Sequence, residues 1–160
     1  MANRKIEYGT ASQGITVTLV SLAQAAARES TAIDNTSNKF VDAIVYLAIA
    51  VQSGTPASDK RINIWFYGSE DGTNYGDNAT GSDAAVTMRS PTNLMGPFVI
   101  NVPTAAPTTY KAIIPSVAEY FGGVLPPKWG IVVENRTNLS LSATEGDNTK
   151  EYRGVFETIV

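Results

Sequence analysis

The chain has 160 residues, a formal net charge of −3 and neither cysteine nor histidine. This length fits one domain that buries enough surface to fold without cross-links. The missing residue types exclude disulfides, thiolate-bound metals, and the Ser–His and Cys–His pairs of nucleophilic enzymes. They also argue against the usual zinc, copper and iron sites. The acidic balance argues against a nucleic-acid-binding protein, which carries a basic patch.

Residues 1–14 are predicted to form an N-terminal arm that precedes a single β-sandwich domain over residues 15–160. The arm is polar, with Ile6 and Tyr8 as its large apolar side chains. Two alternatives remain open: a frayed end, or an extended segment that contacts a neighbouring subunit through Ile6 and Tyr8. The basic residues at its start are not followed by an apolar segment. We therefore expect no signal peptide, and synthesis in a cytoplasm.

The stretch Val41–Val51 is the strongest predicted strand. Alternate residues from Val41 to Val51 form an unbroken apolar row, and the opposite face is apolar but mixed. This pattern predicts a strand in the middle of a sheet, partly covered on its second side. The stretch is too short to span a membrane as a helix, which requires about 20 apolar residues.

The next predicted strand is Arg61–Tyr67, in which Ile62, Ile64 and Phe66 face one way and the polar and aromatic residues face the other. The two strands are expected to be antiparallel neighbours joined by the polar loop around residues 54–60. Shorter segments are predicted as further strands: Ile15–Leu19, Ala27–Ile33, Ala84–Met88, Leu94–Val102, Thr108–Ile114, Trp129–Asn135, Leu139–Ala143 and Tyr152–Ile159. The segment Ala27–Ile33 also has helical propensity.

One short helix is predicted near residues 116–122, because Ser116 and Glu119 have capping-box spacing and Gly122 can end it. The weaker segments aside, the pattern gives about eight strands at a spacing of about ten residues. The predicted fold is therefore all-β: a two-sheet antiparallel sandwich, jelly-roll-like, with about eight strands.

The loop over residues 68–83 is rich in turn-forming residues and is expected to be exposed. Its Asp71–Asp83 stretch has oxygen ligands for Ca²⁺, but the fifth position is Tyr75 and the twelfth is Ser82, so it fails the EF-hand pattern. A solvated turn is the favoured interpretation, and no metal or cofactor is predicted.

Paired carboxylates can hydrolyse glycosides, and the candidates are Asp42, Glu119 and Glu134. Each has a structural explanation at a strand end or a helix cap, so no catalytic residue is predicted and the chain is not expected to be an enzyme. The candidate binding residues are Trp65, Tyr67 and Trp129, which either fill one end of the core or stack on a sugar or a protein partner.

Three stretches, taken in order, resemble small virion structural proteins of tailed bacteriophages: residues 27–43, Tyr67–Tyr75 and Phe121–Asn135. The resemblance runs from about Leu19 to the C-terminus, and it rests on the order and spacing of all three stretches. It implies a β-sandwich that assembles in many copies on the virion. Within this group, a capsid decoration (cement) protein that bridges capsomers is the preferred role. The resemblance identifies no functional residues in this chain.

The resemblance implies two partners, the major capsid protein and copies of the chain itself as a dimer or trimer, with neither nucleic acid nor membrane. Charged residues are 17% of the chain, below the about 25% of typical soluble domains, which suits packing against other protein. The expected location is the virion, after synthesis in the cytoplasm of the host bacterium. The alternative role is a tail or baseplate component, a receptor-binding module that recognises host surface glycan. A glycan-cleaving enzyme is the third alternative.

Overall fold

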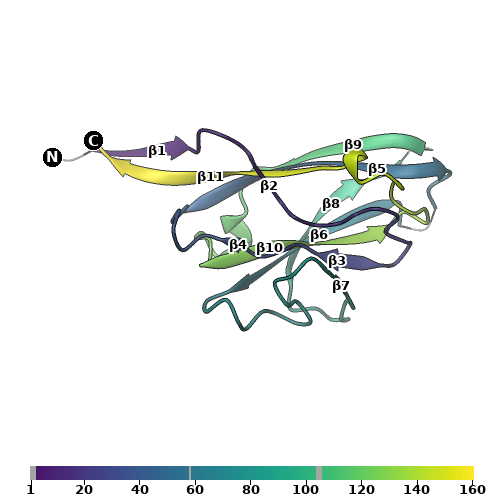
Figure 1. Ribbon diagram of the computed structural model, residues 1–160, viewed down its shortest axis with the longest axis horizontal. Coiled ribbons are helices and arrows are strands. Elements are labelled where there is room, and N and C mark those ends of the chain that lie inside the picture. The colour runs from purple at the N-terminus through teal and green to yellow at the C-terminus, as the bar shows by residue number, and fades with distance from the viewer. Residues whose placement is uncertain (1–2, 58, 104–105) are drawn as a thin grey trace.

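The computed structural model describes residues 3–57, 59–103 and 106–160, which form two antiparallel sheets packed face to face (Figure 1). The first sheet contains β1 (Arg4–Tyr8), β2 (Gln13–Gly14), β5 (Asp42–Gly54), β9 (Ala106–Ile114) and β11 (Thr149–Ile159). The second contains β3 (Ala27–Glu29), β4 (Ile33–Asp34), β6 (Arg61–Ser69), β7 (Ala84–Val86), β8 (Met95–Asn101) and β10 (Lys128–Arg136). Two short 3₁₀ helices, η1 (Ala118–Phe121) and η2 (Glu145–Asp147), complete the described elements.

The strand order is that of a jelly roll. The first sheet runs β1-β11-β5-β9 and the second runs β7-β3-β10-β6-β8, with β2 beside β11 and β4 beside β10. With β1 and β2 counted as one strand, and β3 and β4 as another, eight strands form this double Greek key, and β7 is added at an edge. The predicted all-β, two-sheet antiparallel sandwich is confirmed.

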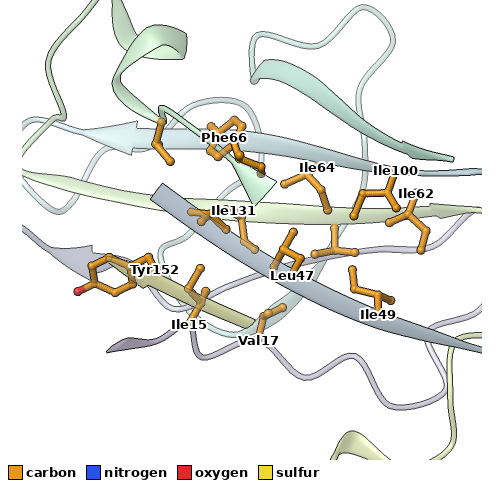
Figure 2. Packing of buried hydrophobic residues seen from close by; sticks show 14 of the residues in the cluster. Ile15, Val17, Leu47, Ile49, Ile62, Ile64, Phe66, Ile100, Ile131 and Tyr152 are labelled. Carbon is orange, nitrogen blue, oxygen red and sulfur yellow. The ribbon is translucent and has the colours of Figure 1, made fainter. Parts of the chain in front are cut away.

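The core lies between the inner faces of the two sheets (Figure 2). From β5, Val45, Leu47 and Ile49 point into it and are fully buried, as the alternation predicted. Across from them, β6 contributes the fully buried Ile62, Ile64 and Phe66. The second face of β5 is partly covered, which also agrees with the prediction.

The expectation that β5 and β6 are paired neighbours is wrong. β5 pairs with β11 and β9, whereas β6 pairs with β10 and β8 in the other sheet. The segment between them crosses from one sheet to the other, so their apolar rows meet across the interior of the sandwich. Alternation identifies the buried face of a strand but not the strand beside it.

Two predicted strands are not strands in the structure. Residues 15–19 are extended, and Ile15, Val17 and Leu19 are buried in alternation, but they form no ladder. Carboxylates bind the N–H groups at the end of this segment: Asp83 accepts from Thr18 at 3.0 Å, and Glu145 accepts from residues 19 and 20 at 2.7 and 2.8 Å. At its start, the Ile15 N–H donates to the Lys150 carbonyl at 2.8 Å. The stretch 139–143 contributes an isolated bridge between Leu141 and Val51.

The predicted short helix is present as η1. The Ser116 hydroxyl accepts a hydrogen bond from the Glu119 N–H at 3.2 Å, and the Asp42 carboxylate accepts one from the Ala118 N–H at 2.8 Å. Gly122 ends the helix in the left-handed region, with φ of 81°. No helix among the described residues is long and apolar enough to cross a membrane.

Leu47 tests the position of the core. Leu47→Ala is expected to lower the free energy of unfolding by about 2–5 kcal/mol, because it leaves a cavity between the sheets. Ile113→Ala is the matched control, since Ile113 is 62% exposed on β9 of the same sheet and its loss should change stability by less than about 0.5 kcal/mol. Chemical denaturation followed by circular dichroism measures both, and equal losses would contradict the described packing.

Candidate functional site

The outer face of the second sheet is partly covered by the chain on either side of β7, residues 70–83 and 87–94, which lies beneath this sheet in Figure 1. A second apolar cluster fills the space between them. Its buried members are Ala27, Tyr67, Val86, Leu94 and Val132. The loop predicted to be exposed is therefore packed against the sheet along one side, although many of its polar residues still face solvent.

Glu29 anchors this loop to β3. Its side chain is fully buried, and its carboxylate accepts hydrogen bonds from the Thr80 N–H, the Thr80 hydroxyl and the Gly81 N–H at 2.8–3.1 Å. Neither Glu29 nor its role was predicted, because the loop residues that bind it lie about 50 residues away in the chain. A buried carboxylate of this kind requires such donors.

A second anchor is Asp83, at the end of the loop. Its carboxylate accepts hydrogen bonds from the Arg28 Nε at 2.5 Å, the Thr18 hydroxyl at 2.6 Å and the Thr18 N–H at 3.0 Å. Burial by itself raises the pKa of Asp83, but these hydrogen bonds and the Arg28 charge outweigh it and hold the pKa below its ordinary value.

Beside the covered region, the same outer face is hollowed into a groove of about 740 Å³. Its floor consists of the outward rows of β6 and β10, and its far wall is the segment from β7 to Thr92. The side chains that give it chemical character are Arg61, Asn63, Trp65, Arg89, Glu134 and Arg136. Because Tyr67 and Val132 on the same face are packed under the loop, the open groove is the more polar part of this face.

The strand register sets the order of these side chains. Asn63 lies opposite Glu134, and Arg61 lies opposite Arg136. Glu134 Oε2 accepts hydrogen bonds from Asn63 Nδ2 at 2.8 Å and from the Trp65 indole N–H at 3.0 Å. The hydrogen bond to Glu134 thereby orients the indole ring in the groove floor.

The charges of the groove form a network. The two opposed guanidinium groups of Arg61 and Arg136 both contact Asp59, at 3.6 and 2.9 Å, and Arg136 also lies 3.7 Å from Glu134. On the far wall, Arg89 donates to Asn78. The side-chain oxygen of Asn63 is buried without a hydrogen-bond partner in the described part of the chain. The buried Asn63 oxygen is closed to a ligand, so the groove offers an indole ring and cationic donors.

The three predicted aromatic residues do not form one exposed platform. Trp129 is fully buried in the core, where it packs edge-to-face on Tyr152 with ring centres 5.3 Å apart. Tyr67 is 1% exposed and donates its hydroxyl hydrogen to the Ser30 carbonyl at 2.5 Å. Trp65 is half-buried and lines the groove, so it is the one of the three that a ligand can reach.

Tyr67 lies over Gly130, its neighbour on β10 in the sheet register. A β-carbon at Gly130 would lie 2.4 Å from the Tyr67 ring, so glycine is what permits this close approach. Burial raises the pKa of the Tyr67 hydroxyl well above its ordinary value, an effect that outweighs the hydrogen bond to Ser30.

The predicted contact residues of the arm are exposed, Ile6 at 65% and Tyr8 at 59%. They lie on β1, which pairs along its whole length with the end of β11. The first fourteen residues also include β2, a second short pairing with β11. The described part of the arm thus belongs to the first sheet.

The Asp71–Asp83 loop is held by its own hydrogen bonds. The Asp71 carboxylate accepts from the N–H groups of Thr73 and Asn74, both at 2.8 Å, and from the Ser69 hydroxyl. These bonds, those from Asn74 first, hold the pKa of Asp71 far below its ordinary value. Among the described residues, no group of three or more His, Cys, Asp or Glu residues is arranged to hold a metal ion.

The three candidate catalytic carboxylates are not brought together. Asp42 caps η1 from the first sheet, Glu119 is exposed on η1, and Glu134 lies in the groove of the second sheet. The groove network was missed because the partners lie far apart in the sequence. The one available signal was the outward face of residues 61–67.

Comparisons of the chain with protein-family models, curated proteins and solved structures found no match.

Acid should loosen the anchor at Asp83. The folded pKa of Asp83 lies below the unfolded one, so its contribution to stability is complete above the ordinary carboxyl pKa of about 4. That contribution is lost as the pH falls through the folded pKa. Asp83→Asn is expected to cost about 1–3 kcal/mol at pH 7 and to flatten the acid limb of a stability–pH curve. Glu119→Gln, at an exposed carboxylate, is the control and should change the stability at pH 7 by less than about 0.5 kcal/mol.

Proposed function

We propose that this chain is a structural protein of a tailed-bacteriophage virion, a capsid decoration (cement) protein that stabilises the head by bridging capsomers. The observation that carries the proposal is an antiparallel jelly roll from which a two-stranded ribbon projects with exposed apolar side chains (Figure 1). This ribbon consists of β1 and the end of β11. Jelly rolls form viral capsid domains, and also lectins and cupins, so the fold by itself does not select among these. The resemblance of three stretches to phage virion proteins favours the first.

The proposed mechanism is mechanical. A decoration protein lies across boundaries between capsomers and adds buried surface, so that expansion of the head under packaged DNA must break more contacts. An interface of standard size buries about 1,600 Å² in total, and many repeated copies add avidity. The partners are the major capsid protein and other copies of the chain. The proposed location is the virion, after synthesis in the cytoplasm of the host bacterium.

Copy number tests this proposal. Quantitative mass spectrometry of purified particles is expected to find hundreds of copies of the chain per particle. Gentle chaotrope treatment should release them, and the stripped heads should lose DNA at a lower temperature than intact heads. A few to a few dozen copies per particle, located on the tail, would contradict the decoration role and favour a tail component.

The groove favours one other function, recognition of host surface glycan by a tail or baseplate component. Aromatic faces and polar groups fixed in orientation are what a saccharide ligand needs. Trp65 supplies the ring, and its N–H is held by Glu134 at 3.0 Å. Arg61 and Arg136 supply hydrogen-bond donors.

Tryptophan fluorescence tests glycan binding directly. The chain has two tryptophans, and Trp129 is fully buried, so a saturable change on titration with host surface oligosaccharide reports on Trp65. Trp65→Phe should abolish the change and weaken binding, measured by calorimetry, by about 5- to 30-fold, the effect of losing about 1–2 kcal/mol. Trp129→Phe should keep the signal. A signal that persists in Trp65→Phe would place any binding elsewhere.

A further inference from the structure

The projecting ribbon consists of β1 and the end of β11, and it carries both ends of the described chain away from the sandwich (Figure 1). Pairing runs from Arg4 opposite Ile159 to Tyr8 opposite Val155. β5 pairs with β11 only as far as Val155, so the last part of β11 has β1 as its one ladder partner in the described chain. A two-stranded ribbon is marginally stable in water without a further contact.

The outer edge of β1 is open. Asn3 and Val160 exchange two backbone hydrogen bonds, at 3.0 and 2.9 Å, and the Gly9 N–H donates to Gly154 at 2.8 Å. Antiparallel pairs alternate, so Lys5 and Glu7 also turn their backbone groups toward β11. The N–H and C=O groups of residues 4, 6 and 8 therefore point away from β11, and no described strand lies along that edge. Such an edge is a template for another strand.

We propose that β1 pairs with β1 of a second copy of this chain, antiparallel, about a two-fold axis through Ile6. In this register the two Ile6 residues exchange backbone hydrogen bonds. Arg4 lies opposite Tyr8 of the partner subunit, and Lys5 lies opposite Glu7 of the partner subunit. The five-residue sequence of β1 is thus complementary to itself about its central residue. Opposite charges that face each other across strands stabilise a sheet.

The charges also disfavour the neighbouring registers, although Lys5 and Glu7 already form an ion pair within one chain, 2.8 Å apart. Hydrogen bonds between the two copies can form only among residues 4, 6 and 8, whose backbone groups point outward. The two-fold axis can therefore move only in steps of one residue, to Lys5 or to Glu7. An axis at Lys5 places the two Lys5 side chains opposite each other, and an axis at Glu7 does the same for the two Glu7 side chains. Like charges directly opposite are destabilising. The axis through Ile6 is the one that opposes unlike charges.

Exposure agrees with a second copy as the occupant. Ile6, Tyr8, Ile159 and Val160 are each more than half exposed, and all four lie on or beside this ribbon. Pairing of five-residue strands buries less than a standard interface, so we expect a dimer that dissociates on dilution. This inference deepens the proposed function, because it rests on the expectation that copies contact one another on the virion.

Charge exchange tests the register. Sedimentation velocity of the purified full chain is expected to show a monomer that converts to a dimer as concentration rises. Lys5→Glu and Glu7→Lys, each alone, should raise the dissociation constant by about tenfold, because each turns two attractive pairs into two repulsive ones. The double exchange should restore it to near the wild-type value. Failure of the double exchange to restore dimerisation would overturn this register.

Proline tests the strand pairing. Ile6→Pro removes an N–H that faces the open edge, and proline is tolerated there, so the β1–β11 ladder should stay intact. The variant should remain monomeric with an unchanged unfolding midpoint, whereas Ile6→Val should dimerise like the wild type. A wild-type chain that is monomeric at every concentration, or a dimer that Ile6→Pro leaves unaffected, would overturn the inference.

The two proposals fail separately. A monomeric chain that is still present in hundreds of copies per particle would contradict the dimer alone. A chain that forms the β1-paired dimer in solution but is absent from purified heads would contradict the decoration role alone.

Discussion

The apolar rows of β5 and β6 must be buried against each other, and the rest of the fold depends on this contact. Leu47 and Ile49 meet Ile62 and Ile64 in the interior, and all four are fully buried. Two strands that face each other in this way cannot pair edge to edge, so each needs its own neighbours. β11 and β9 flank β5, and β10 and β8 flank β6. The chain must then cross repeatedly between sheets, which produces the jelly roll.

Carboxylates complete the structure where ladders are missing. Asp83 and Glu145 bind the N–H groups of residues 18–20, which have no strand beside them, and Glu29 fixes the long loop over the second sheet. Each interaction joins residues about 50 or more positions apart, so together they tie the loops to the sandwich. Their consequence is an asymmetric molecule, because the loop covers the outer face of the second sheet beside the groove.

The two candidate contact surfaces use different chemistry and lie on different sheets. The ribbon presents unpaired backbone groups and exposed apolar side chains, which suit another strand. The groove presents an oriented indole ring and guanidinium groups, which suit a polar ligand. Because they do not share residues, loss of one surface leaves the other available, and their roles can be separated by substitution.

Local sequence patterns are enough to predict which strand faces are buried and where the short helix lies. Alternation from Val41 to Val51 and the spacing of Ser116 and Glu119 are properties of neighbouring residues, so they survive in any tertiary arrangement. Tertiary structure alone decided that β5 and β6 lie in different sheets and that residues 15–19 form no ladder. It also decided that Trp129 is buried while Trp65 borders a groove with Glu134, 69 residues away. These features depend on long-range pairing and register, which local periodicity does not encode.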